Sequence, residues 1–210
     1  MKNFGIIFIR CFVILSFALF ASCAQIAQEE AKDLVPINTI GVLPALPVSI
    51  SVQPSDTKTM EQLEAGAQII DTLLLEYFSS HKNVRFISQA ELESLQTGQA
   101  GNPIYLAREA GRQLAYDAVL VTEVIRYQTR TGTAYAVDSP ASVAFAFKLL
   151  AAANSQVIWS AEFDQTQQPL FENILKSRTT GSGFRWLTAA ELTEAGMTKK
   201  LNSCPYLHKD

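Results

Sequence analysis

A short stretch ending at Cys23 constrains this chain more than any other part of its sequence. Leu19-Phe20-Ala21-Ser22-Cys23 closes an apolar run and places two small residues directly before a cysteine. The apolar run, Cys11–Phe20, follows the positively charged Lys2 and Arg10, and this order is typical of a secretory signal peptide. The small residues indicate a lipobox, the site at which a bacterial signal peptide is cut and the new first residue is acylated. We therefore predict a lipoprotein signal peptide over residues 1–22 and lipidation of Cys23.

A retained membrane helix is the alternative interpretation of this segment. A spanning helix needs about 20 apolar residues, and Arg10 interrupts the run that begins at Phe4. Each buried methylene contributes roughly 0.8 kcal/mol, so several acyl chains on Cys23 would anchor the chain stably to a lipid membrane. Ala24, rather than an aspartate, follows the cysteine. By resemblance to Gram-negative lipoproteins, this favours the periplasmic face of the outer membrane.

The charge of the chain gives no sign of nucleic-acid binding. The formal net charge is −3, from 17 basic and 20 acidic residues. Lys2 and Arg10 would leave with the signal peptide, which makes the remaining chain more acidic still. The basic residues form no cluster, so we expect no nucleic-acid partner.

The cysteines argue against a disulfide within the processed chain. Cys11 would leave with the signal peptide, and acylation would occupy the sulfur of Cys23. Cys204 would then have no partner in the same chain, although two cysteines in an exported protein normally suggest a disulfide. We predict a free thiol at Cys204, with a bridge between two chains as the alternative.

The residues after Cys23 predict a tether followed by one domain. Residues 24–36 are polar, rich in alanine and without periodicity, so residues 23–36 are assigned to a lipid-anchored tether. Apolar periodicity then predicts a domain over residues 37–202 and a tail over residues 203–210. The expected elements are strands at 37–43, 84–87, 118–127, 142–150 and 157–163, a loop or hairpin at 128–140, and helices at 59–80, 88–95, 103–116, 169–176 and 188–196.

The strongest local pattern lies in the last two strands. Val143, Phe145, Phe147 and Leu149 share one face of the first strand, and the second alternates in the same way, which predicts a hairpin. Capping boxes, in which a hydroxyl residue is followed three positions later by Glu or Gln, begin at the residues Thr59, Ser88 and Thr188. The element order predicts an α/β (α+β) fold: a single mixed sheet of about five strands packed with helices, and a carboxy-terminal hairpin followed by short helices.

Three segments resemble a group of periplasmic lipoproteins. They are Ile40–Pro44 (IGVLP), Ala107–Val121 (AREAGRQLAYDAVLV) and Asn154–Ser160 (NSQVIWS). The group includes the curli-secretion lipoprotein, the penicillin-binding-protein activator lipoprotein and the amino-terminal domain of the Tol translocation protein. The resemblance covers about Ile37 to Phe163. It implies the architecture more strongly than the role, because it involves residues that build the fold rather than a catalytic signature.

Candidate catalytic groups are few. After the signal peptide the chain has only His81 and His208, which we interpret as solvated, and no group of His and Cys has the spacing of a metal site. We predict no catalytic residues, no metal and no cofactor. The alternative to a chain without catalytic residues is a hydrolase that uses paired carboxylates on one helix. The acidic residues of that helix are Glu61, Glu64, Asp71 and Glu76. We favour the interpretation that they form a solvated helix face.

A region near the end of the hairpin has the composition of a partner-binding surface. Amides and aromatic residues beside a sheet edge suit such a surface, because Trp, Tyr and Arg dominate binding hot spots. The candidate residues are Gln165, Gln167, Gln168, Phe184, Arg185 and Trp186. The competing interpretation is that Trp186 and Phe171 pack the terminal helices on the sheet.

These features predict a non-enzymatic, membrane-anchored envelope lipoprotein. It would act as a binding or assembly module for envelope or secretion components, with an unidentified envelope protein as its partner. A regulator of a peptidoglycan synthase is the alternative within this class, and a carboxylate-dependent envelope hydrolase is the alternative from another class. Whether the chain forms a homo-oligomer is left open.

Overall fold

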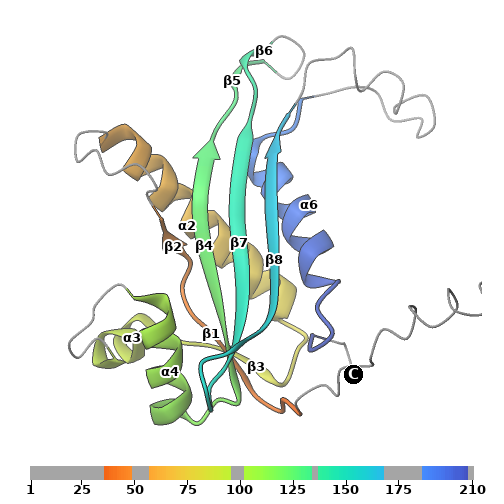
Figure 1. The fold of residues 1–210 in the computed structure, drawn as a ribbon. Helices are drawn as coiled ribbons and strands as arrows, with labels where there is room; N and C mark the ends of the chain where they lie inside the picture. Colours follow the sequence, from red (N-terminus) through yellow and green to blue (C-terminus); the bar gives the residue numbers. More distant parts are fainter. Residues whose placement is uncertain (1–35, 49–56, 96–101, 134–136, 168–185, 208–210) are drawn as a thin grey trace, which may run out of the picture. The chain divides into compact units, whose positions relative to one another are not determined.

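A computed structural model describes residues 36–48, 57–95, 102–133, 137–167 and 186–207 (Figure 1). The chain divides into two compact units, Met1–Pro36 and Ile37–Asp210, and the elements below belong to the second. The predicted signal peptide, Cys23, nearly all of the tether and the predicted helix at 169–176 lie outside the described residues. Within the described ranges, none of the helices combines the length and the apolar character that a membrane span requires.

A mixed sheet of six strands forms the centre of this unit, in the order β3-β1-β4-β7-β8 with β2 paired to β4. The strand β1 runs parallel to β3 and β4, whereas β7 runs antiparallel to its two neighbours, β4 and β8. The predicted mixed sheet is therefore confirmed, with the strand at 118–127 in its middle. The strands are β1 (Ile40–Val42), β2 (Leu46–Pro47), β3 (Val84–Phe86), β4 (Ala118–Gln128), β7 (Ser142–Ala151) and β8 (Val157–Thr166).

Helices cover the two faces of the sheet unequally (Figure 1). The long helix α2 and the last helix α6 pack on one face, and α3 and α4 pack on part of the other. The rest of that second face, over the upper half of β4, β7 and β8 in Figure 1, carries no described helix. The helices are α2 (Thr57–Phe78), α3 (Gln89–Leu95), α4 (Pro103–Leu114) and α6 (Ala189–Leu201).

The aromatic side chains of the hairpin form the core beneath α2 and α6. Phe145, Phe147 and Leu149 are fully buried there, as the period-two pattern of β7 predicts. The ring of Phe145 stacks on Phe163 with centroids 5.2 Å apart, and Phe147 stacks on Trp159 at 6.4 Å. The alternation thus places these rings between the sheet and the two helices.

Close packing of α2 on the sheet depends on a glycine. A Cβ atom added at Gly66 would lie 2.6 Å from the side chain of Tyr127 on β4. Only a residue without a side chain lets the helix approach this closely. The same device recurs where Gly196 of α6 meets Phe163, at 2.7 Å.

Two of the three predicted capping boxes are confirmed. The backbone N–H of Ser88 donates to Glu91, whose own N–H donates to the Ser88 hydroxyl. Thr188 and Glu191 make the same reciprocal pair at the start of α6. The third prediction, at Thr59, is wrong, because α2 already begins at Thr57 and Thr59 lies inside its first turn.

The domain extends past its predicted carboxy-terminal boundary. Cys204 and Leu207, which the sequence placed in a tail from residue 203, are buried in the core beside α2 and α6. The hydroxyl of Tyr77 donates a 2.8 Å hydrogen bond to Asn202 and ties this end to α2. Apolar side chains after α6 thus hold the chain on the core, so the boundary moves to at least Leu207. The Cys204 thiol is free, and burial raises its pKa to about 11.

The loop at 128–140 forms a small hairpin beyond the main sheet. Its strands are β5 (Thr131–Gly132) and β6 (Val137–Ser139), and they pair antiparallel. The hydroxyls of Thr131 and Ser139 share a 2.8 Å hydrogen bond across it. This hairpin continues from the end of β4 and returns to the start of β7, at the top of Figure 1.

Candidate functional site

The predicted partner surface is only partly formed by described residues. Gln168, Phe184 and Arg185 lie outside the described ranges, as does Cys23. Gln165 is exposed near the end of β8, as a surface residue should be.

The other two predicted residues of this surface are buried. Trp186 is 6% exposed and Gln167 is 8% exposed. Trp186 is therefore wrong as a surface anchor, and its burial agrees with the competing interpretation, in which it packs inside the domain. The backbone N–H of Gln167 donates to Ala141, which fixes this residue against the start of β7.

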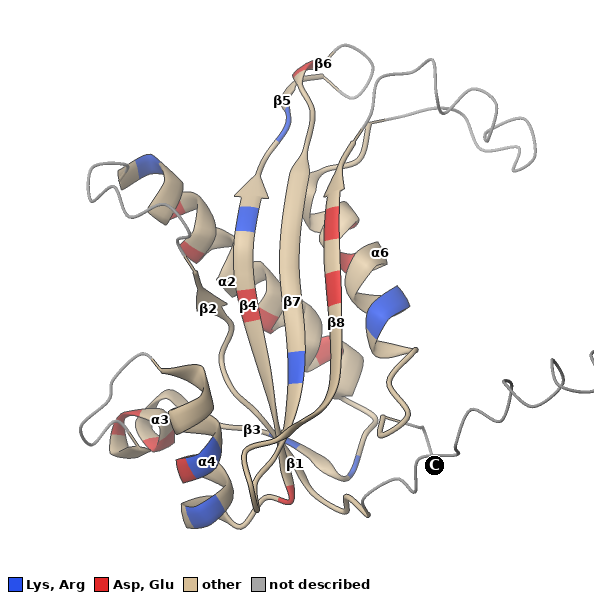
Figure 2. Ribbon diagram, in the orientation of Figure 1, with Lys and Arg blue, Asp and Glu red and all other residues tan. Residues whose placement is uncertain are grey.

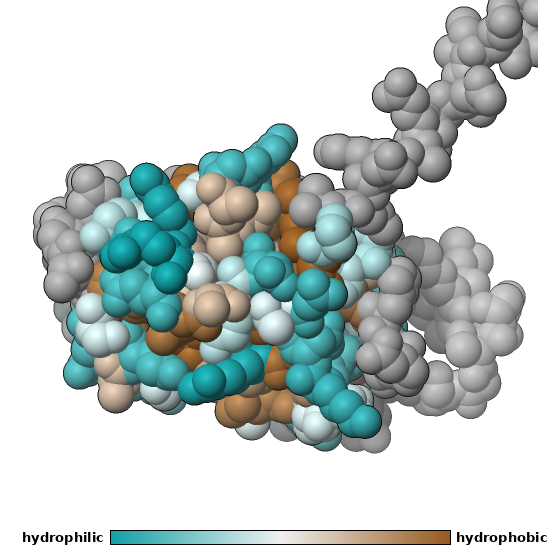
Figure 3. Space-filling model, turned by 90° about the horizontal axis from the view of Figure 1, so that it is seen from below, coloured by the Kyte–Doolittle hydropathy of each residue, from teal (hydrophilic) through white to brown (hydrophobic). Residues whose placement is uncertain are grey.

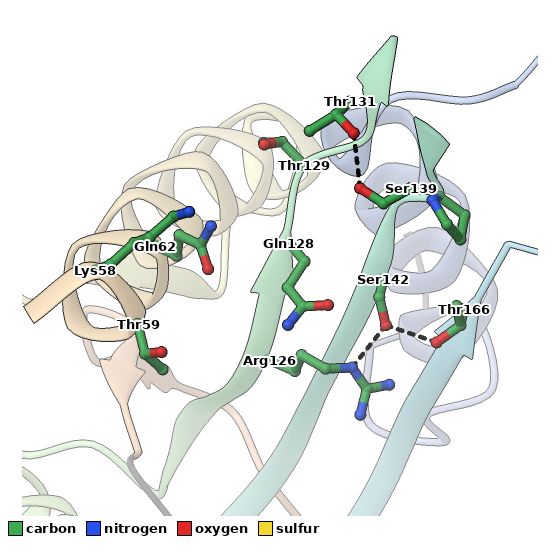
Figure 4. Close-up of a pocket in the computed structure, with 11 residues that line it drawn as sticks. Lys58, Thr59, Gln62, Arg126, Gln128, Thr129, Thr131, Ser139, Ser142 and Thr166 are labelled. Carbon is green, nitrogen blue, oxygen red and sulfur yellow. Dashed lines mark hydrogen bonds between the residues drawn. The ribbon is translucent and has the colours of Figure 1, made fainter. Parts of the chain in front are cut away.

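A polar pocket lies beside this region, where β4 and β8 end and β7 begins (Figure 4). Its volume is about 810 Å³. The first turns of α2 form one wall, and the strands with the 128–140 hairpin form the others. The lining consists mainly of hydroxyl, amide and cationic side chains: Lys58, Thr59, Gln62, Arg126, Gln128, Thr129, Thr131, Ser139, Pro140, Ser142 and Thr166.

A bulge in β4 turns Arg126 toward this pocket. Val124 pairs with Phe145 on the helix-covered face, yet Arg126, only two positions later, pairs with Ala144. The extra residue between them shifts the alternation of the strand. Without the bulge, Arg126 would share the face of Val124 and lie in the apolar core.

Hydrogen bonds link three strands along the floor of the pocket (Figure 4). The Nε of Arg126 donates to the Ser142 hydroxyl at 2.7 Å, and that hydroxyl lies 2.6 Å from the hydroxyl of Thr166. A second guanidinium nitrogen of Arg126 is paired with the Asp164 carboxylate of β8. The pair reaches across β7, which presents only the small Ala144 between them.

The open part of this sheet face carries further charges on β4, β7 and β8 (Figure 2). Lys148 of β7 donates to both carboxylate oxygens of Glu123 on β4, at 2.8 and 2.7 Å. The opposite end of the unit, viewed from below in Figure 3, shows hydrophobic and hydrophilic residues interspersed. The pocket thus lies at the end of the unit opposite to the one viewed in Figure 3, and its lining is mainly polar.

The predicted acidic helix face does not assemble into a catalytic pair. Glu61, Glu64 and Glu76 are exposed on α2, which agrees with a solvated face. Asp71 is partly buried and accepts the N–H of Ala45 at 2.8 Å. Burial raises the pKa of Asp71, and the hydrogen bond from Ala45 opposes that shift. These four acids do not line the pocket.

His81 is structural rather than solvated. It is 7% exposed and its ring stacks on Tyr77, with Phe78 at its edge. The interpretation of His81 as a solvated residue is therefore wrong, because the turn after α2 folds the ring back onto that helix. Among the described residues, no His, Cys, Asp and Glu side chains gather as metal ligands.

No family model and no curated protein matches the chain. Solved structures with some similarity include the PelC dodecamer from Paraburkholderia phytofirmans, 19% identical over 79% of this chain and 85% of that chain, with a TM-score of 0.42. The LpoB C-terminal domain from Salmonella enterica is 13% identical over 64% of this chain and 87% of that chain, with a TM-score of 0.39. Lipoprotein GNA1162 from Neisseria meningitidis is 18% identical over 70% and 94% of the two chains, with a TM-score of 0.33.

One of the three groups named in the sequence resemblance is among these structures. LpoB is the penicillin-binding-protein activator lipoprotein of that comparison. The resemblance to the curli-secretion lipoprotein and to the Tol protein stays an expectation from sequence. The identities and TM-scores are too low to carry an inference about function.

Few features of the sequence indicated the pocket. Its lining comes from α2, the end of β4, the small hairpin, the start of β7 and the end of β8, which are far apart along the chain. The available signals were the hydroxyl-rich segment 128–140 and the position of Arg126 directly after the apolar pair Val124-Ile125.

Proposed function

We propose that this chain is a membrane-anchored, non-enzymatic lipoprotein of the Gram-negative envelope that acts as a binding or assembly module. The lipobox at Cys23 supports the anchor, and Ala24 supports the periplasmic face of the outer membrane. The observation that carries the binding role is the lining of the pocket. Hydroxyls, amides and cations converge there from five segments of the chain, which suits recognition of a polar partner.

The pocket supports binding better than hydrolysis. The Ser142 hydroxyl accepts a hydrogen bond from Arg126, a side chain that donates hydrogen bonds and cannot act as a base at neutral pH. A nucleophilic hydroxyl would need a base, such as a histidine, a carboxylate or a neutral lysine, within hydrogen-bond reach. The lining includes no histidine or carboxylate, and within the described residues Lys58 makes no hydrogen bond to a hydroxyl. The acids that motivated the hydrolase alternative lie on α2 instead, three of them exposed to solvent.

The tether limits where such a module can work. Residues 24–36 extend to roughly 45 Å at most, at 3.3–3.6 Å per residue. The domain would thus stay close to the membrane that holds Cys23, which favours partners at that membrane. A peptidoglycan-synthase regulator is one form of such a module, and its synthase would have to extend to within the reach of the tether from that membrane.

Site-specific photocrosslinking in cells tests the proposal. A photoreactive residue at Gln128, in the pocket, should give a defined adduct with an envelope component, and Cys23→Ser should abolish the adduct. Gln113 on α4 is an exposed glutamine outside the pocket and serves as the matched control. Equal adducts from both positions, or an adduct indifferent to Cys23→Ser, would contradict the proposal. Peptidoglycan cleavage that Glu64→Gln removes would support the hydrolase instead.

A further inference from the structure

We propose that the pocket binds an anionic group, a carboxylate or a phosphate, carried on a hydroxyl-rich ligand. This names a ligand class for the pocket and rests on its proposed binding role. The inference follows from the charges of the lining, from the state of Arg126 and from the size of the hollow.

The lining is positive in a chain that is negative overall. Lys58 and Arg126 contribute two cations to the lining, which itself includes no carboxylate. Arg126 is paired with Asp164, whose exposed carboxylate lies next to the lining, so Lys58 carries the charge that this pair does not balance. The chain as a whole carries a formal net charge of −3. Within the described residues, Lys58 makes no ion pair or hydrogen bond, and its side chain extends from α2 toward β4 in Figure 4.

Arg126 is held in position by its contacts and still has N–H groups that can donate to a ligand. Its guanidinium has five N–H groups, and the two contacts to Ser142 and Asp164 leave others for a ligand. The Arg126 side chain is 33% exposed, whereas that of Asp164 is 68% exposed. A planar guanidinium fixed in this way matches the geometry of a carboxylate or a phosphate. A bound anion can share the guanidinium with Asp164 or displace its exposed carboxylate.

The remaining lining suits a ligand that carries hydroxyl groups. Thr59, Gln62, Gln128 and Thr129 supply groups that both donate and accept hydrogen bonds. The volume of about 810 Å³ far exceeds that of a bare phosphate and falls among small-molecule sites, at roughly 300–1,000 Å³. The start of α2 adds the positive end of a helix dipole to this wall. A sugar or another polyol bearing one anionic group meets all of these conditions.

Titration of the purified full-length protein in detergent tests this directly. The probes are glucose 6-phosphate and glucuronate, with glucose as the neutral counterpart. We expect saturable binding of at least one anion, at least about tenfold tighter than that of glucose, as for one charge-assisted contact. The stronger of the two anions identifies the anionic group as a phosphate or a carboxylate.

Matched lysine variants locate the binding site. Lys58→Gln should weaken the favoured anion about tenfold, whereas Lys82→Gln should leave its affinity unchanged. Both lysines are exposed and the charge change is the same, but Lys82 lies beyond the far end of α2, a helix about 33 Å long. Arg126→Lys keeps the charge and loses the planar fork, so it should also weaken binding, with an unchanged melting temperature showing that the fold is intact.

Three results would overturn the inference. They are glucose binding as tightly as both anions, no saturable binding of either anion, and equal weakening by Lys58→Gln and Lys82→Gln. The photocrosslink at Gln128 separates this inference from the proposed function. A persistent crosslink without anion binding would reject the anion site alone, and loss of the crosslink with intact anion binding would reject the assembly role alone.

Discussion

Phe145 illustrates how much of this fold depends on single buried side chains. Its ring is fully buried and contacts Phe147 and Phe163, each with centroids 5.2 Å away. We predict that Phe145→Ala lowers the free energy of unfolding by about 3–5 kcal/mol, a large part of the roughly 5–15 kcal/mol that stabilises a domain. Denaturant unfolding measures this. Leu75→Ala, which truncates a half-exposed apolar side chain on α2, should cost about 1 kcal/mol or less. Similar losses in both variants would contradict the assigned core.

We predict that Asp117 makes a pH-dependent contribution to stability. Its carboxylate accepts the backbone N–H groups of Asn38 and Thr39, and these bonds, with the Thr39 hydroxyl, lower its pKa below the ordinary 3.8. A lowered pKa stabilises the folded state above the ordinary pKa, and this stabilisation is lost as the pH falls through the lowered value. We therefore predict that Asp117→Asn melts below the wild type at neutral pH and that the gap narrows under acid conditions.

Thermal melts of the wild type and Asp117→Asn between neutral pH and about pH 2 test this prediction. Asp138→Asn, at an exposed carboxylate of the small hairpin, is the matched control and should give no gap at any pH. A gap for Asp117→Asn that is constant across the range would show that the lost hydrogen bonds, rather than the charge, explain its effect.

We predict that the Cys204 thiol reacts slowly with thiol reagents in the folded protein. Cys204 is 2% exposed, so a reagent can hardly reach its sulfur. Burial raises the pKa of the thiol to about 11, so little of the reactive thiolate is present at neutral pH. A maleimide should label Cys204 slowly in buffer and rapidly in denaturant, with the site identified by mass spectrometry. Rapid labelling without denaturant would place the segment around Cys204 outside the core.

At the scale of elements, the capping box of α6 sets where the last helix begins. The Thr188 hydroxyl accepts the N–H of Glu191 at 3.2 Å, and the Glu191 carboxylate accepts the N–H of Thr188 at 2.8 Å. Thr188→Ala should lower the free energy of unfolding by about 1 kcal/mol. Thr198→Ala, in an exposed position of the same helix, should be nearly neutral. Equal effects would mean that the cap contributes nothing beyond the general cost of the substitution.

The elements show what a sequence of this kind reveals by itself. The hairpin and the caps at Ser88 and Thr188 were predictable because each depends on residues close in the chain, through period-two alternation or a hydroxyl three positions before a glutamate. The start of α2 was misplaced at Thr59 because two residues preceding it also adopt the helix. The strand β2 was not predicted. Its two residues form a strand only through pairing with β4, which is distant in sequence.

The errors at the candidate site have the same origin. Trp186 was assigned to a surface because Trp is enriched in binding hot spots, but in the folded domain its side chain is buried. The pocket was not predicted as a unit, because its lining residues come from five segments that meet only in the folded domain. The bulge that turns Arg126 away from the core is a feature of strand pairing and leaves no pattern in the residues themselves.

At the scale of the whole molecule, the predicted anchor at Cys23 and the pocket lie in different parts of the chain. The helix-covered face of the sheet holds the larger apolar cluster, and the strands β4, β7 and β8 carry charged residues (Figure 2). A short tether would keep that pocket near the membrane. The proposed anchor and the proposed binding site can therefore be changed by separate substitutions.

Metabolic labelling with a fatty acid tests the central claim most directly, because a binding module of the envelope membrane requires an acylated Cys23. Wild-type chain expressed in a Gram-negative bacterium should incorporate the label, and Cys23→Ser should incorporate none while still being produced. Arg126→Lys, which changes only the pocket, should be labelled like the wild type. Equal labelling of the wild type and Cys23→Ser, or no labelling of either, would contradict the account.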